Sequence, residues 1–129
     1  MPCTVVVCGF FGDTGKGKII AYLSLKDKIA VTARAGVGPN AGHTVVYEGK
    51  EYRLRMVPSA FVYKRCRLLI GPGVLINPQI LIQEIELTNS QNRVGVDPLC
   101  AIIEPKHIEA DRKGELAEKI KTTGTGTGP

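Results

Sequence analysis

Residues 9–18 read Gly-Phe-Phe-Gly-Asp-Thr-Gly-Lys-Gly-Lys, and they lie between the apolar runs Thr4–Cys8 and Ile19–Leu23. This order predicts a strand, a glycine-rich loop and a helix. Glycines allow consecutive backbone N–H groups of such a loop to converge, and the following helix directs the positive end of its dipole at the same point. The segment therefore predicts a phosphate-binding turn in an α/β fold.

The loop departs from the Walker A pattern at two places. Five residues separate Gly9 from Gly15, one more than the pattern allows, and Gly17 stands where a metal-binding Ser or Thr would follow the lysine. Asp13 is the candidate metal ligand, because a carboxylate inside a phosphate loop would repel the ligand unless a cation or a catalytic role accounted for it. The alternative is a glycine-rich turn in which Asp13 only caps the helix.

A second glycine-rich loop, residues 34–44, follows the apolar segment Ile29–Ala33. Loops after the strands of α/β proteins commonly carry the chemistry. Asn40 supplies a donor and an acceptor, and His43 is one of only two histidines in the chain. A lone loop histidine usually belongs to the polar surface, but its place near Asn40, in a chain with a phosphate loop, favours a titratable site.

Both loops resemble those of the adenylosuccinate synthetase family. The family's first loop reads approximately Gly-Asp-Glu-Gly-Lys-Gly-Lys and matches residues 12–18, with Thr14 in the place of Glu. Its second reads Asn-Ala-Gly-His-Thr and matches residues 40–44. The similarity continues through residues 57–59, 71–74 and 122–129, the last being similar to the family's Thr-Thr-Gly-x-Gly-x-Gly-Pro element. The compact loops look most like the shorter archaeal branch of the family.

The resemblance implies a GTP-dependent carbon–nitrogen ligase of AMP biosynthesis, which joins IMP and L-aspartate through 6-phosphoryl-IMP. It implies two catalytic residues: Asp13 takes the proton from N1 of the purine so that the 6-oxygen can attack the γ-phosphate, and His43 donates to that oxygen. Mg²⁺ is the implied cofactor, held by Asp13 and the backbone carbonyl of Gly42 together with phosphate oxygens.

The resemblance also assigns residues to the two nucleotides. Those expected to bind GTP are Gly12, Asp13, Thr14, Gly15, Lys16, Gly17, Lys18, Gly42, His43 and Thr44. Those expected to bind IMP are Asp13, Thr14, Gly15, Lys16, Asn40, Ala41, Gly42, His43 and Thr123.

The family's chain is several hundred residues long, so we expect residues 1–129 to be the N-terminal nucleotide- and IMP-binding part of a larger α/β synthetase domain, truncated after Pro129. A homodimer is expected for the complete enzyme. The alternative is a stand-alone nucleotide-binding or regulatory module that keeps the phosphate cradle without the chemistry.

Composition is compatible with this assignment. Hydrophobic residues make up 43% and charged residues 22%, as in globular proteins, and neither a membrane-spanning run nor a signal peptide is found, so a cytoplasmic protein without membrane contact is expected. The net charge of +5 suits anionic nucleotides, while the 5% aromatic content and the lack of a basic run disfavour nucleic acid. The four cysteines form no Cys-x-x-Cys pair, which favours reduced, buried thiols over a metal site.

The remaining pattern predicts a mainly parallel sheet flanked by helices, P-loop-NTPase-like, with a β-hairpin excursion. The expected hairpin strands are 44–47 and 51–56 around Glu48-Gly49-Lys50. Asn77 and Pro78 predict the start of a helix that runs to about residue 89 and buries Ile80, Leu81, Ile85 and Leu87. Further strands are expected at 67–70, 93–96 and 99–103, and a polar helix within 106–121 around Leu116 and Ile120.

Overall fold

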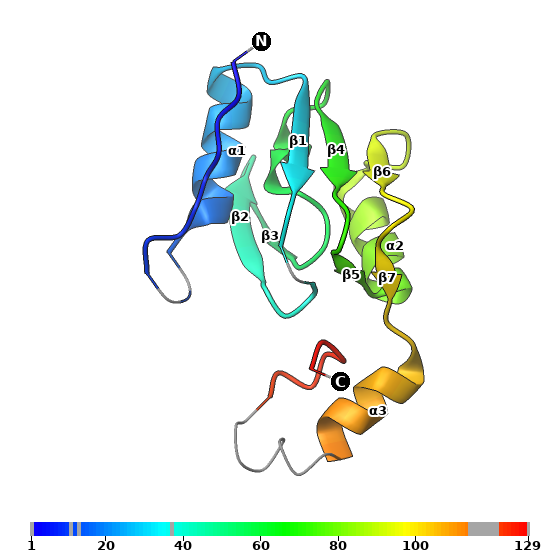
Figure 1. Ribbon diagram of the computed structural model, residues 1–129. Coiled ribbons are helices and arrows are strands. Elements are labelled where there is room, and N and C mark those ends of the chain that lie inside the picture. Colours follow the sequence, from blue (N-terminus) through cyan, green and yellow to red (C-terminus); the bar gives the residue numbers. More distant parts are fainter. Residues whose placement is uncertain (1, 11, 13, 37, 114–121, 129) are drawn as a thin grey trace.

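A three-stranded parallel sheet forms the centre of the computed structural model, which describes residues 2–10, 12, 14–36, 38–113 and 122–128. Its strand order is β1 (Val31–Arg34), β4 (Arg67–Ile70) and β6 (Val94–Val96). In Figure 1, helix α1 (Lys16–Lys26) lies on the β1 side of this sheet and helix α2 (Pro78–Thr88) on the β6 side. The expected α/β class, with a mainly parallel sheet flanked by helices, is confirmed.

The predicted hairpin is present as β2 (His43–Tyr47) and β3 (Lys50–Leu54), which pair antiparallel. Its turn contains only Glu48 and Gly49, both with positive φ, at 50° and 75°. Two such residues form the turn whose twist matches the strands it joins. Lys50, expected in the turn, instead pairs with Tyr47.

Helix α2 begins where the sequence predicts. Pro78 is its first residue, and the Asn77 side chain caps it by accepting a hydrogen bond from the Ile80 N–H at 3.2 Å. Leu81 is buried, and Ile80 and Ile85 pack partly buried against the core. Leu87 was expected to pack there too, but its side chain is 41% exposed, because this position faces the groove between α2 and β3.

Three short elements complete the structure. Strands β5 (Leu75–Ile76) and β7 (Ala101–Ile102) pair parallel, and a 3₁₀ helix, η1 (Ser59–Val62), follows the hairpin. Neither β5 nor η1 was predicted from the sequence, since both are too short for a periodic pattern. Helix α3 (Pro105–Lys113) confirms the first half of the expected polar helix, whereas Leu116 and Ile120 lie outside the described residues.

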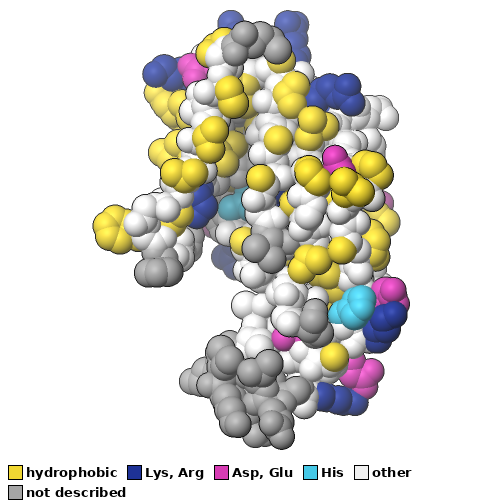
Figure 2. Space-filling view, in the orientation of Figure 1, with side chains coloured by type: hydrophobic (Ala, Val, Ile, Leu, Met, Phe, Trp, Pro, Cys, Tyr) yellow, Lys and Arg dark blue, Asp and Glu magenta, His cyan; other side chains and the backbone are white. Residues whose placement is uncertain are grey.

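The expected N-terminal strand Thr4–Cys8 is wrong. These residues pair with none of the described strands, and Val5 and Val7 are each 77% exposed. In Figure 1 the segment is drawn across α1 and apart from the arrows of the sheet. An extended segment becomes a strand only when a neighbour takes up its N–H and C=O groups. Figure 2 shows hydrophobic side chains spread over the face that carries this segment.

The core lies between the sheet, the hairpin, η1 and α2, and its largest fully buried side chains include Leu54, Met56, Leu68 and Ile70. All four cysteines are free; Cys66 is buried as expected, but Cys3 is exposed because it belongs to the unpaired N-terminal segment. No helix in the described part of the chain is long and apolar enough to cross a membrane.

Candidate functional site

The first turn of α1 lies at the same end of the molecule as the carboxyl ends of β1 and β4 (Figure 1). Gly15 precedes the helix in a left-handed conformation, φ 78°, and its carbonyl accepts hydrogen bonds from the N–H groups of Lys18 and Ile19 at 3.0 and 3.2 Å. Lys16 is half-buried and Lys18 exposed. Helix N–H groups without helical partners and two cations give this turn the chemistry of an anion site.

Gly17 brings this turn into contact with the second loop. A Cβ added to Gly17 would lie 2.7 Å from the His43 Cβ and 3.0 Å from the Ser59 Oγ. No Ser or Thr side chain fits there without displacing His43. The missing Walker A hydroxyl is therefore explained by packing, and the two motifs predicted from sequence are joined at this contact.

His43 begins β2, and its Nε2–H donates to the Val57 carbonyl at 2.9 Å. A carbonyl can only accept a hydrogen bond, so the neutral ring carries its proton on Nε2, and Nδ1 is unprotonated. Burial lowers the pKa of His43, the Val57 hydrogen bond opposes this, and the charge of Arg34 lowers the pKa further. The ring is therefore held neutral near physiological pH, in one orientation.

Arg34, the last residue of β1, shapes the exposed part of the second loop. Its Nη2 donates to the Gly38 carbonyl at 2.8 Å and to the Ala41 carbonyl at 3.3 Å. Burial lowers the pKa of Arg34, although a guanidinium remains charged. Asn40, Ala41 and Gly42 stay exposed beyond these contacts, so their backbone and side-chain groups are accessible to a ligand.

The C-terminal motif meets the second loop at Gly38, where an added Cβ would lie 3.2 Å from the Thr127 Cγ2. Asp111 holds this motif, since its Oδ2 accepts a hydrogen bond from the Gly126 N–H at 2.8 Å. Thr123 is exposed, and its hydroxyl lies 2.9 Å from that of Thr125. Within the described residues, no hydrogen bond joins Thr123 to residues 40–43.

The other predicted site residues are less closely assembled. Asp13, the expected base and metal ligand, lies outside the described residues. Gly12 is exposed with φ 94°, and the Thr14 hydroxyl lies 3.2 Å from the Cys8 Sγ. Thr44 is half-buried in β2, opposite Arg53.

Three charged residues at this end of the fold were not assigned any role from the sequence: Arg34, Glu84 and Asp111. Glu84 and Asp111 are only 6% exposed. A usable signal exists for Glu84, which shares the helical spacing of the buried Leu81 and Thr88 and is therefore a charge within a buried stripe. His107, by contrast, accepts the Glu104 N–H at the start of α3, as a capping residue would.

This structure has a parallel sheet with a glycine-rich loop, a helix N-terminus and a histidine at the carboxyl ends of its strands. Such an arrangement is typical of the P-loop-type α/β proteins that bind nucleotides. The sequence model of the adenylosuccinate synthetase family matches residues 5–129, and the chain belongs to this family.

Individual relatives agree with this assignment. The chain is 57% identical to the adenylosuccinate synthetase of Archaeoglobus fulgidus and 53% identical to that of Methanocaldococcus jannaschii, and in each case it is matched over its full length. It spans only 39% of the length of these relatives. These archaeal matches agree with the likeness to the archaeal branch and do not favour a stand-alone module.

Solved structures give the same fold. The fully ligated adenylosuccinate synthetase of Plasmodium falciparum superimposes with a TM-score of 0.81 at 33% identity, over 92% of this chain and 29% of that one. A succinoaminodeoxyadenylate synthetase of cyanophage S-2L, bound to dGMP and to dATP as an energy donor, gives a TM-score of 0.77 at 30% identity, over 91% and 33%.

Proposed function

We propose that this chain is the N-terminal, nucleotide-binding part of an adenylosuccinate synthetase, which ligates IMP and L-aspartate at the expense of GTP. The observation that supports the proposal most directly is the packing of Gly17 against His43, which brings the glycine-rich loop and the second loop into contact. Archaeal relatives at 57% and 53% identity favour IMP and GTP over the deoxynucleotides named for the phage enzyme.

In the first step the 6-oxygen of IMP attacks the γ-phosphorus of GTP, an O–P bond forms, and the bond to the leaving GDP breaks. Asp13 accepts the N1 proton in this step, which makes the 6-oxygen nucleophilic. His43 acts through Nδ1, the ring atom that Val57 leaves available. The negative charge of the bound phosphates favours protonation of Nδ1, and the resulting Nδ1–H donates to the charge that develops on the transferring group. The amine of L-aspartate then displaces phosphate at C6.

The phosphate groups are bound by backbone and cationic groups. Gly12 to Lys18 receive the phosphates of GTP, with Lys16 and Lys18 neutralising charge. Gly42, His43 and Thr44 also contact GTP. IMP is bound by Asp13, residues 14–16, residues 40–43 and Thr123. Residues 40–42 are exposed, as residues that contact a ligand must be before it binds.

The residues present fit Mg²⁺. Position 17 offers no side-chain oxygen, and no three His, Cys, Asp or Glu side chains gather to hold a metal among the residues that the structure describes. The ligands would be Asp13, the carbonyl of the exposed residue Gly42 and phosphate oxygens, all of them the hard oxygen donors that Mg²⁺ prefers. Bound there, Mg²⁺ supplies neutralisation of the phosphate charge.

The proposal is tested by assaying the complete enzyme for adenylosuccinate with IMP, L-aspartate, GTP and Mg²⁺. We expect product to form only when all three substrates are present. We also expect the complete enzyme to be a homodimer and to be found in the cytoplasm. Parallel reactions with dGMP in place of IMP and dATP in place of GTP test the specificity named for the phage enzyme. Product from dGMP but not from IMP would replace the proposed substrate.

A further inference from the structure

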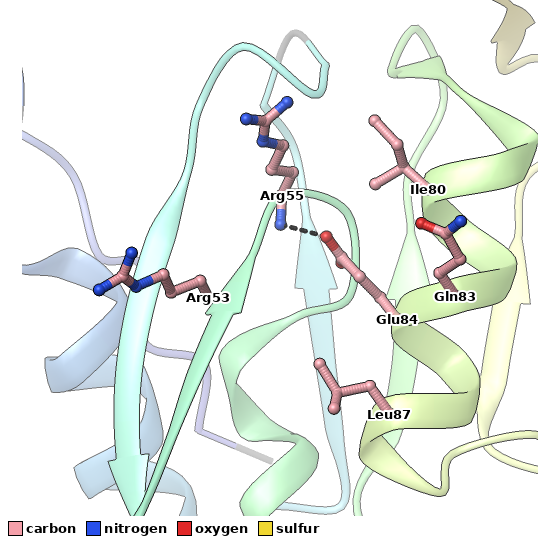
Figure 3. A pocket seen from close by; sticks show the side chains of 6 residues that line it. All are labelled: Arg53, Arg55, Ile80, Gln83, Glu84 and Leu87. Atoms are coloured by element: carbon pink, nitrogen blue, oxygen red, sulfur yellow. Dashed lines mark hydrogen bonds between the residues drawn. The ribbon is translucent and has the colours of Figure 1, made fainter.

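Glu84 is a buried carboxylate with no role in the chemistry described so far. It lies on α2, is 6% exposed, and accepts hydrogen bonds from three consecutive backbone N–H groups, those of Arg55, Met56 and Val57, at 2.6, 2.8 and 2.8 Å. Figure 3 shows it reaching from α2 toward the chain that leaves β3, with the bond to the Arg55 backbone drawn. Three charge-assisted bonds fix this short segment firmly.

Residues 55–57, to which Glu84 is hydrogen-bonded, include the hydrogen-bond acceptor of the His43 ring. Val57 donates its N–H to the Glu84 Oε2 and accepts the His43 Nε2–H with its own carbonyl. Pro58 follows, so the backbone at the next residue is restricted as well. The Glu84 carboxylate and the His43 imidazole are thus both hydrogen-bonded to Val57, so the position of the imidazole depends on that of the carboxylate.

We propose that Glu84 is a positioning residue for His43: by fixing residues 55–57 it holds the Val57 carbonyl where it binds Nε2–H and turns Nδ1 toward the substrates. The inference rests on the proposed function, because it assumes that His43 acts in phosphoryl transfer. A helix buries apolar side chains more favourably than a charge, so the carboxylate at this position needs a reason beyond packing.

The sharpest variant is Glu84→Gln in the complete enzyme. The glutamine oxygen can still accept from two of the three N–H groups, but its amide N–H₂ faces the third donor, so one bond is lost while shape and volume remain. Glu84→Ala would lose all three and can unfold the protein. The matched control is Glu86→Gln, which removes the same charge from an exposed position on the same helix.

Two measurements separate positioning from mere stability. The first is NMR of the histidine ring nitrogens, in which the His43 signals are assigned by their absence from the spectrum of His43→Asn. The wild type and Glu86→Gln should show a single Nε2–H tautomer of His43, and Glu84→Gln should show mixed tautomers. His107, held by the Glu104 N–H, is the internal reference. In the assay, Glu84→Gln should lower kcat by about tenfold to a hundredfold with little change in the KM for IMP.

A Glu84→Gln enzyme with lower thermal stability but wild-type His43 resonances and kcat would overturn the proposal, and so would an equal effect of Glu86→Gln. If the wild-type enzyme makes no adenylosuccinate, the proposed function fails, but the tautomer measurement still decides whether Glu84 orients His43.

Discussion

At the scale of single residues, the site depends on close contacts that leave no room for other side chains. Gly17 is the clearest case, because the space a side chain would need is taken by His43 and Ser59. Gly9, in the same loop, has no atom within 4 Å of an added Cβ and no positive φ, so glycine is not required there by space. The two glycines therefore predict different responses to the same substitution.

Gly17→Ala should lower kcat of the complete enzyme and weaken GTP binding, because the first turn of α1 and His43 must move apart to admit the methyl group. The loss of stability should be about 1–3 kcal/mol, as for overpacking elsewhere. Gly9→Ala is the control and should bind GTP like the wild type. Equal effects of both variants on GTP affinity, measured by calorimetry, would show that the contact with His43 is not what matters.

Asp13→Asn should remove most turnover, because the base is lost together with a metal ligand. Loss of a general base alone costs about 10² to 10⁴ in rate. Single-turnover formation of product measures this, and Mg²⁺ titration separates the two roles. Near-normal turnover of Asp13→Asn would contradict the assignment of Asp13 as the base.

His43→Asn should lower kcat more than it raises the KM for IMP, because His43 is assigned to charge that develops in the transition state. Steady-state kinetics with varied IMP provide both parameters. A large rise in KM with unchanged kcat would instead assign His43 to ground-state binding.

At the scale of elements, α2 has two functions in the fold: it packs Leu81 into the core, and it carries Glu84 to the chain that leaves β3. Its start is set locally by Asn77 and Pro78, so the position of Glu84 along the helix is set locally as well. The groove between α2 and β3 is lined by Arg53, Arg55, Ile80, Gln83, Glu84 and Leu87 (Figure 3).

Asn77→Ala should destabilise the protein by about 1 kcal/mol, because the N–H of Ile80 loses its side-chain acceptor. Chemical denaturation measures the change. Asn92→Ala is the control, since Asn92 is exposed and lies outside the helices and strands. An unchanged free energy of unfolding in Asn77→Ala would mean that the cap does not contribute.

At the scale of the whole molecule, the described chain leaves large apolar side chains uncovered, among them Val5, Val7 and Leu99 at 77%, 77% and 75% exposure. The chain also spans 39% of the length of its archaeal relatives. The glycine-rich loop and His43 lie within these residues, and we expect the recognition of guanine and L-aspartate to need the remainder of such a longer chain.

The 129-residue chain by itself should therefore make no adenylosuccinate. It should bind GTP and ATP weakly and with similar affinity, because backbone N–H groups and lysines recognise phosphate rather than the base. Calorimetry with both nucleotides and a product assay measure this. Synthesis by a homogeneous preparation, or a strong preference for GTP, would contradict the prediction.

Much of the fold was predictable because its signals are local. The cap of α2 at Asn77 and the tight turn at Glu48 and Gly49 each depend on a few neighbouring residues. The resemblance likewise assigned site roles to His43 and residues 40–42 from short motifs, and these roles stay predictions. The N-terminal segment was predicted wrongly, because its apolar composition is typical of a strand but strand pairing requires a partner elsewhere.

By itself, then, the sequence determined the parallel α/β class, the hairpin and the family, since each is signalled by short motifs of neighbouring residues. Only the tertiary structure decided that Gly17 packs against His43 and that Gly38 packs against Thr127. It also decided that Glu84 is hydrogen-bonded to Val57, the residue that accepts the hydrogen bond of His43. The physical reason is distance along the chain: such contacts depend on the packing of whole elements, which no local pattern specifies.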